Sequence, residues 1–303
     1  MLCGEMLQCS NLGWVPLYYA FFVHVNMNKA QVPKGHAYWA GKGVAWNKCR
    51  NVSDIALSLP ADLRQAIRVS RRIAFESRVY PGSAELSCPA TSANVVLHNY
   101  SLSVNMKKYT QRAQAKRCLR AEGMWSLLGH ATVSRCMYDT IAKLFGFGPG
   151  HVVLDWGAGC GHSLNALAKQ RGFTAVAVDA VVENVEWGQA NLQYVNSFCY
   201  NNRIDLPFAA NVLNFVVSYA ALDHVRVHLQ CRVLRNIVLK GLRPGGCAWI
   251  GWHGNNNDVA AQRYHLPTFW KGTCFPDLLD VVVATFWEES VGGPYSIILC
   301  KNQ

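Results

Sequence analysis

The feature that most constrains this chain is a short apolar run followed at once by alternating glycines, residues 152–161. The run Val152-Val153-Leu154 is typical of a buried strand, and Asp155 stands where that strand is expected to end. Residues 165–169 predict the helix that follows the turn, which contains Gly157, Gly159 and Gly161. Because glycine carries no Cβ, such a turn lets the polar groups of a ligand approach the backbone. The stretch therefore predicts an α/β fold with a ligand site beyond its first strand.

The spacing of the glycines separates this turn from two common nucleotide-binding turns. No Gly-Lys-Ser/Thr is present, so the turn is not a P-loop, and its third glycine comes one residue earlier than in the dinucleotide fingerprint. Residues 174–179 predict a second apolar strand that ends in Asp179, 24 residues after Asp155. A carboxylate there can accept hydrogen bonds from both hydroxyls of a ribose, which favours nucleoside binding. The alternatives are a purely structural turn and a surface acid at a strand end.

Four motifs together resemble those of class I S-adenosylmethionine-dependent methyltransferases, and the nearest branch is type 11. They are Leu154–Gly161, Val178-Asp179, Asp205-Leu206-Pro207-Phe208 and Leu242-Arg243-Pro244-Gly245-Gly246, and the resemblance covers roughly residues 124–300. It implies a Rossmann-like, doubly wound α/β fold with a seven-stranded sheet, mostly parallel with an antiparallel last strand. Residues 124–303 would form this domain, and residues 1–123 a basic, partly helical N-terminal extension.

The resemblance also implies a cofactor, S-adenosyl-L-methionine, and residues that bind it. Asp155 and the glycine turn would hold the methionine end, and Asp179 the ribose. Asn202 stands where the family usually has an acid near the adenine amino group, and its carbonyl oxygen can still accept from that group. The main-chain N–H of Arg203 would reach a ring nitrogen. The implied cofactor-binding residues are Asp155, Gly157, Ala158, Gly159, Gly161, Asp179, Ala180, Asn202, Arg203 and Ser218.

The acceptor side is expected beyond a fourth strand, residues 214–219. Nucleic-acid amino-methylating relatives carry Asp/Asn-Pro-Pro-Tyr/Phe there, whereas this chain has Ser-Tyr-Ala-Ala from Ser218, so that chemistry is not expected. Tyr219 and His224 are the candidate catalytic residues, with His224 as a general base. The alternative is that Asp223 caps the next helix and His224 packs. The implied mechanism is direct displacement of the methyl group, which requires no metal.

Further elements follow from periodicity and turn residues. Helices are expected at residues 58–76, 107–120, 124–147, 185–198 and 227–241. Strands are expected at residues 198–200, 247–252, 280–287 and 295–301, with residues 242–246 forming a turn.

The charge of the chain is concentrated in its first half. Residues 1–150 hold 18 Lys and Arg against 7 Asp and Glu, whereas residues 151–303 hold 11 of each. The basic stretches at 58–76 and 107–120 suggest an anionic partner, such as RNA, an acidic protein or an anionic lipid face. The alternative is a solvated helix face. We expect methyl transfer to a small-molecule or protein acceptor; the alternative function is a non-catalytic, methyltransferase-like binding subunit that docks through this basic region.

Cysteines and an apolar N-terminal run bear on the compartment. The 12 cysteines form no Cys-x-x-Cys pair, which disfavours a zinc ribbon, and Cys136, Cys231, Cys247 and Cys300 are expected as small buried hydrophobes. A reducing, intracellular compartment is favoured. The run at residues 12–25 is shorter than the ~20 residues that cross a bilayer, but it leaves a degenerate signal or anchor open.

Overall fold

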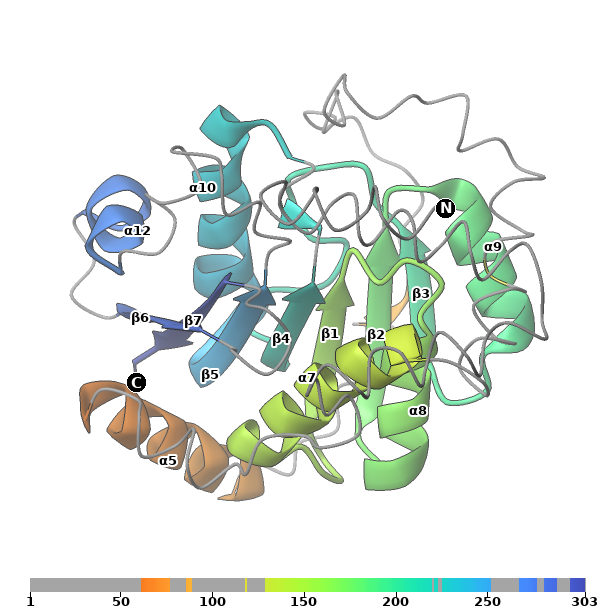
Figure 1. The fold of residues 1–303 in the computed structure, drawn as a ribbon, viewed down its shortest axis with the longest axis horizontal. Helices are drawn as coiled ribbons and strands as arrows, with labels where there is room; N and C mark the ends of the chain where they lie inside the picture. Colours follow the sequence, from red (N-terminus) through yellow and green to blue (C-terminus); the bar gives the residue numbers. More distant parts are fainter. Residues whose placement is uncertain are drawn as a thin grey trace, which may run out of the picture.

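The computed structural model describes residues 61–76, 86–88, 118, 129–219, 221–222, 225–251, 267–276, 281–287 and 295–302. Within these ranges a sheet of seven strands has the order β3-β2-β1-β4-β5-β7-β6 (Figure 1). The strands are β1 Val152–Trp156, β2 Thr174–Asp179, β3 Ser197–Tyr200, β4 Leu213–Tyr219, β5 Leu242–Gly251, β6 Val281–Trp287 and β7 Tyr295–Lys301. The helices are α5 Ala61–Glu76, α7 Gly129–Phe145, α8 His162–Arg171, α9 Val182–Asn191, α10 Val227–Arg235, the π-helix η6 Asn236–Gly241 and α12 Pro267–Cys274.

The sheet is parallel apart from one strand. β1 pairs in parallel with β2 and β4, whereas β7 runs antiparallel between β5 and β6. The expected α/β fold with a mostly parallel sheet and an antiparallel last strand is therefore confirmed. The strand order reverses between β1 and β4, and open α/β sheets bind ligands beyond the carboxyl ends of the strands at such a point.

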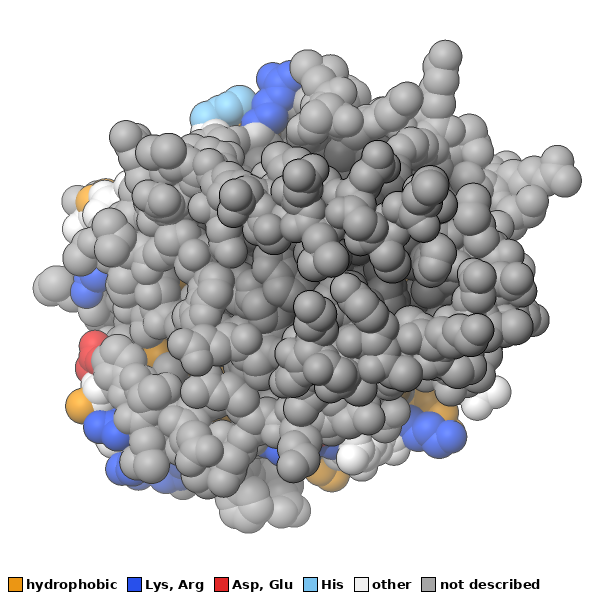
Figure 2. Space-filling model, in the orientation of Figure 1, with side chains coloured by type: hydrophobic (Ala, Val, Ile, Leu, Met, Phe, Trp, Pro, Cys, Tyr) orange, Lys and Arg blue, Asp and Glu red, His pale blue; other side chains and the backbone are white. Residues whose placement is uncertain are grey.

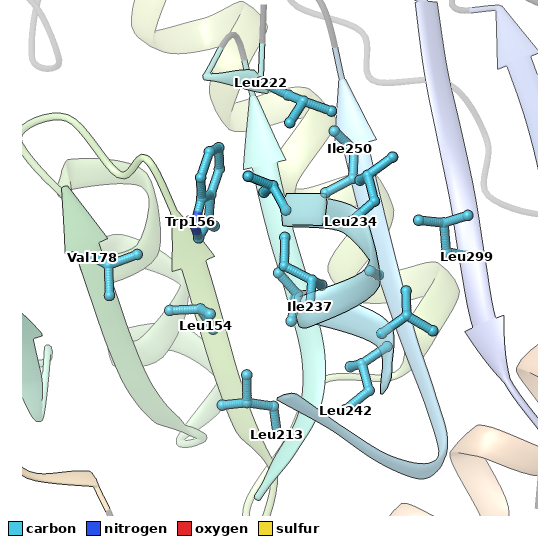
Figure 3. Packing of buried hydrophobic residues seen from close by; sticks show 14 of the residues in the cluster. Leu154, Trp156, Val178, Leu213, Leu222, Leu234, Ile237, Leu242, Ile250 and Leu299 are labelled. Carbon is cyan, nitrogen blue, oxygen red and sulfur yellow. The ribbon is translucent and has the colours of Figure 1, made fainter. Parts of the chain in front are cut away.

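Helices cover both faces of the sheet because its strands are apolar on both sides (Figure 1). On one face Leu63 of α5, Ile141 of α7 and Leu164 of α8 join a core with Phe215 and Trp249. On the other face the buried residues of α10, η6 and α12 pack against alternate residues of the strands. Figure 3 shows this second core, in which Leu234 and Ile237 reach the sheet.

Helix α5 places basic residues on the surface of the expected extension. Leu63 and Ile67 are buried, whereas Arg68, Arg71 and Arg72 are exposed. Blue side chains gather at the lower left of Figure 2, where Figure 1 places α5. The helix thus joins the domain core through one stripe and keeps cations on the opposite one.

Several expected boundaries are wrong. Residues 242–246 are not a turn but the first part of β5, which contains a register shift and Gly245 at φ 75°. The helix expected over 227–241 is α-helical only to Arg235 and continues as a π-helix. The helix expected over 185–198 is α9, which begins at Val182 and ends at Asn191, so that Phe198 lies in β3.

Cysteines expected as free hydrophobes are instead paired in disulfides. Cys231 is bonded to Cys274, and Cys247 to Cys300 on the neighbouring antiparallel strand. Two more disulfides involve cysteines that precede β1 in the chain: Cys88 is bonded to Cys199 of β3, and Cys118 to Cys160 of the glycine turn. Burial of Cys247 and Cys300 is confirmed, but their free thiols are not.

Some predictions lie outside the described residues. These are the apolar run at 12–25 and, apart from Cys118, the basic helix at 107–120. Across the ranges that the structure does describe, no helix has both the length and the apolar character needed to cross a bilayer.

Candidate functional site at the carboxyl ends of β1, β2 and β4

The glycine turn between β1 and α8 is fastened to β2 by main-chain hydrogen bonds. The N–H groups of Gly157 and Ala158 both donate to the carbonyl oxygen of Val178, at 2.9 and 3.0 Å. The three glycines have φ values of 76°, 58° and 74°, a region that L-residues with a Cβ rarely adopt. The sequence therefore folds here into a tight turn directly above the ends of two strands.

The glycines differ in what lies next to them. A Cβ on Gly157 would meet the Cβ of Ala221 at 2.2 Å, and one on Gly161 would meet Leu192 at 2.6 Å. A Cβ on Gly159 would meet nothing within 4 Å. Gly157 and Gly161 are thus needed for packing, whereas a Cβ on Gly159 would crowd no neighbouring atom.

Asp179 ends β2 and holds the turn in place. Its Oδ2 accepts from the N–H of Gly159 at 2.8 Å, and its Oδ1 accepts from the N–H of Val181 at 2.9 Å and from Nδ2 of Asn184 at 3.1 Å. Only 8% of Asp179 is exposed. A carboxylate has about four acceptor positions, so three protein donors leave little room for the two ribose hydroxyls expected there. The first role of Asp179 is therefore to hold the loop.

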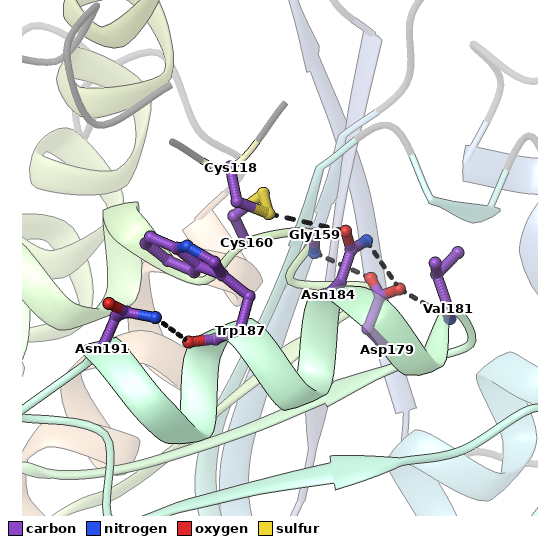
Figure 4. Close-up of a disulfide and its surroundings, with 8 residues drawn as sticks. All are labelled: Cys118, Gly159, Cys160, Asp179, Val181, Asn184, Trp187 and Asn191. Atoms are coloured by element: carbon purple, nitrogen blue, oxygen red, sulfur yellow. Dashed lines mark hydrogen bonds between the residues drawn. A yellow bond between two sulfur atoms is a disulfide. The ribbon is translucent and has the colours of Figure 1, made fainter. Parts of the chain in front are cut away.

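A disulfide closes this arrangement into a ring (Figure 4). Cys160 follows Gly159 in the turn and is bonded to Cys118. Sγ of Cys118 lies 3.7 Å from Oδ1 of Asn184, whose Nδ2 donates to Asp179. The ring therefore joins the turn, the end of β2, helix α9 and a residue from the expected extension.

Asp155 lies inside β1, not at its end, and only 1% of it is exposed. The hydroxyl of Tyr138, on α7, donates to both of its oxygens, at 3.0 Å to Oδ1 and 3.1 Å to Oδ2. Burial raises the pKa of Asp155 to about 7, the Tyr138 hydrogen bond opposes this shift, and the charge of Asp179 adds to it. Burial, together with the Asp155 charge, also holds the pKa of Tyr138 well above its usual range.

Aromatic rings line the β4 side of Asp155. Tyr138 meets Trp249 of β5 edge-on, with centroids 5.9 Å apart, and Trp249 stacks on Tyr219 at 6.2 Å. Tyr219, one of the two expected catalytic residues, is thus at the edge of this cluster. Ser218 beside it is fully buried, and its Oγ has no hydrogen-bond partner among the described residues.

His162 begins α8 directly after the turn and adds no cation at neutral pH. Its ring packs on Trp187 with centroids 4.8 Å apart, and burial lowers its pKa to about 4. The described part of the site therefore holds two buried carboxylates and a neutral imidazole.

The expected adenine side is only partly as predicted. The N–H of Arg203 donates to Oδ1 of Asn201 at 3.0 Å, so it is already engaged and the contact expected with a ring nitrogen is not supported. Asn202 and Ala180 are half-buried near the ends of β3 and β2. His224, with its neighbour Asp223, lies outside the described residues.

Three contributors were not predicted: Tyr138, Asn184 and the Cys118–Cys160 disulfide. Tyr138 follows Met137 on the buried side of α7, and a buried tyrosine usually finds a partner for its hydroxyl, which was the available signal. No local pattern indicates the partners of Asn184 or Cys118, because they come from other elements.

Part of the chain is similar in sequence to a known family. Residues 153–246 match the sequence model of a family described as "Methyltransferase domain". No curated protein matches the chain. Similar solved structures include a proposed S-adenosyl-L-methionine-dependent methyltransferase from Methanococcus maripaludis, with 19% identity and a TM-score of 0.49 over 67% of this chain and 98% of the other. Another is a Haloferax volcanii complex of the Trm112 methyltransferase activator and a proposed methyltransferase. Its sequence identity is 17% and its TM-score 0.47, over 63% of this chain and 98% of the other.

The assignment rests on the family match and on the motifs, since these structural likenesses are remote. The matched residues contain β1 with its glycine turn, Asp179, β4 and the first part of β5. The recognition made on the motifs agrees with this match: residues 153–246 are similar to the family described as a methyltransferase domain.

Proposed function

We propose that the chain is an enzyme that transfers the methyl group of S-adenosylmethionine to a small-molecule or protein acceptor. The observation that carries the proposal is the bond from the N–H of Gly159 to Asp179. It joins the glycine turn to the acid of β2 at Gly159, where an added Cβ would meet nothing within 4 Å, and we propose that the adenosyl group lies there. The family match over residues 153–246 supports the same reading.

The residues present fit this cofactor. Asp155 is a buried acid that would hold the positively charged amino group at the methionine end, directly or through water. Asp179 holds the glycine turn in the position that would face the cofactor. Ala180 and Asn202 would flank the adenine. Bound S-adenosylmethionine supplies an electrophilic sulfonium methyl group, so the protein's task is to align the acceptor with it and to exclude water.

The acceptor would approach along the carboxyl end of β4. Tyr219 and Ser218 end that strand next to the turn, and Ala221 touches the position of a Gly157 Cβ. We propose Tyr219 as a positioning group for the acceptor and His224 as the base that takes its proton. Asp155→Asn and His224→Ala would separate these roles, because the first should weaken cofactor binding and the second only turnover.

Isothermal titration tests the proposal directly. S-adenosylhomocysteine and S-adenosylmethionine should both bind, and NAD should not. Asp179→Ala should weaken S-adenosylhomocysteine binding by about 1–3 kcal/mol, because the glycine turn loses the acceptor that anchors the N–H of Gly159. Glu186→Ala, which removes an exposed acid from the same helix as Asn184, is the matched control and should bind as the wild type does. Absence of heat with both sulfur ligands would refute the proposal.

We also propose that the exposed arginines of α5 contact an anionic partner of the protein. Arg68, Arg71 and Arg72 lie on the outer side of the helix, while Leu63 and Ile67 fasten it to the core. A contact of this kind weakens with ionic strength. Charge reversal at Arg68 and Arg72 should therefore abolish a salt-sensitive interaction and leave cofactor binding unchanged.

A further inference from the structure

Tyr138 and Asp155 form a buried pair in which one hydroxyl contacts both carboxylate oxygens, although a single contact would be enough to satisfy the hydroxyl. One phenol hydroxyl lies at nearly equal distances, 3.0 and 3.1 Å, from the two oxygens of a single carboxylate. The Tyr138 ring is held by Trp249, which itself stacks on Tyr219. The hydroxyl is therefore fixed by packing and in turn fixes the plane of the Asp155 carboxylate.

The titratable groups that face this pair from the described elements are either neutral or negatively charged. From β2 the charge of Asp179 raises the pKa of Asp155, and from β4 Tyr219 adds to the shift of Tyr138. No Lys, Arg or His of the described ranges forms an ion pair with Asp155. Burying a carboxylate with one neutral donor leaves its charge poorly compensated, so a cation brought by a ligand would gain from it.

We propose that Tyr138 is a positioning residue that orients Asp155 toward the amino group of the cofactor and couples cofactor binding to release of a proton from Asp155. The inference rests on the proposed function. It adds a residue of α7 to the site and gives the site a dependence on pH that the glycine turn alone would not have.

The sign of the coupling follows from linkage. Free Asp155 has a pKa of about 7, so below neutral pH it is mostly protonated and cannot pair with an ammonium group. Binding of the cation favours the carboxylate, and the proton passes to the buffer. Affinity should therefore fall by about tenfold for each pH unit below 7 and level off above it. Since the Tyr138 hydrogen bond stabilises the carboxylate, Tyr138→Phe should move the midpoint to higher pH.

The experiment measures binding of two ligands by the full chain at pH 5.5–8. S-adenosylhomocysteine carries the amino-acid end, whereas 5′-methylthioadenosine keeps the adenosyl group and lacks that end. We expect a pH-dependent affinity for the first and a flat one for the second. Titration in two buffers of different ionisation enthalpy should show about one proton released per S-adenosylhomocysteine bound near pH 6.

Substitutions test whether the pH dependence of binding comes from Tyr138 and Asp155. Tyr138→Phe should shift the midpoint upward by about half a pH unit or more, and Asp155→Asn should remove the pH dependence. Tyr194→Phe, at a tyrosine that is 40% exposed, is the matched control and should leave the profile unchanged. A normal midpoint in Tyr138→Phe would show that Tyr138 is only structural and would overturn the inference.

Two other outcomes are distinguishable from this one. If the wild type binds S-adenosylhomocysteine with no dependence on pH, the proposed function stands and the inference fails. If neither adenosyl ligand binds at any pH, the proposed function itself fails, and the inference fails with it.

Discussion

Two buried carboxylates lie on neighbouring parallel strands of this sheet, and their surroundings differ. Asp179 accepts from three N–H groups that belong to the glycine turn, the next turn and α9. Asp155 accepts from the hydroxyl of Tyr138, whose ring packs against Trp249. The first is thus built into a polar, cross-linked frame, and the second keeps an incompletely compensated charge.

The difference shows that residue type and position on a strand do not by themselves determine the role of an acid. The role also depends on the side chains that the neighbouring helix brings to the carboxylate. Helix α9 brings an amide to Asp179, whereas α7 brings a phenol to Asp155. The acid that holds the turn is therefore separate from the acid that is suited to pair with a ligand's positive charge.

The largest expected effect comes from breaking the cross-link on the Asp179 side. The Cys118–Cys160 and Cys231–Cys274 disulfides span 42 and 43 residues, so replacing either pair by serine should destabilise the fold by a similar amount, about 4 kcal/mol. Only the first pair lies beside Asn184, and only its loss should weaken S-adenosylhomocysteine binding. Urea denaturation and titration of both double variants would test this, and equal loss of affinity in both would contradict it.

A smaller effect is expected from the glycines that lie between the two acids. Gly157→Ala should cost about 2–4 kcal/mol of stability, because φ is 76° and the new methyl group overlaps Ala221. Gly159→Ala has open space around it, so we expect only the conformational cost of about 1–2 kcal/mol, but a large loss of cofactor affinity. Denaturant midpoints that ranked the two variants the other way would show that the crowding at Gly157 is relieved by movement.

The smallest effect concerns the amide on α9. Asn184→Ala removes a donor to Asp179 and should cost about 1 kcal/mol of stability, with a modest loss of cofactor affinity. Asn191→Ala is the matched control on the same helix, because its side chain is exposed and, among the described residues, donates to the carbonyl of Trp187 and not to Asp179. Thermal unfolding and titration of both variants would reveal whether the frame around Asp179 depends on this amide.

Local pattern was enough to locate the strands. The run at 174–179 was expected with the bounds that β2 has, because an uninterrupted apolar run bounded by turn residues indicates a buried parallel strand. The wrong prediction of a turn at residues 242–246 also came from local pattern. The turn signal there is physical, since Gly245 has φ 75°, but it produces an irregularity within β5 because Leu242 already pairs with Leu213.

The site was predictable only where one segment builds it. The glycine turn and the two acids belong to β1, β2 and the segment that follows β1, so their spacing in the sequence was enough to propose them. Their partners come from elsewhere: Tyr138 from α7, Asn184 from α9 and Cys118 from the part of the chain before α7. A helical period indicates that a side chain points inward, but it does not say which group it will meet.

The disulfides of Cys88 and Cys118 have a consequence for biosynthesis. Cys118 is translated 42 residues before Cys160, and Cys88 is translated 111 residues before Cys199. An oxidase that acts on the growing polypeptide would find the early cysteines before their partners exist, and would offer them the wrong ones. The two native pairings need Cα atoms within about 4.4–6.8 Å of each other, a separation that Cys199 reaches with Cys88 and Cys160 with Cys118 in the folded sheet and turn, so we expect oxidation to follow their assembly.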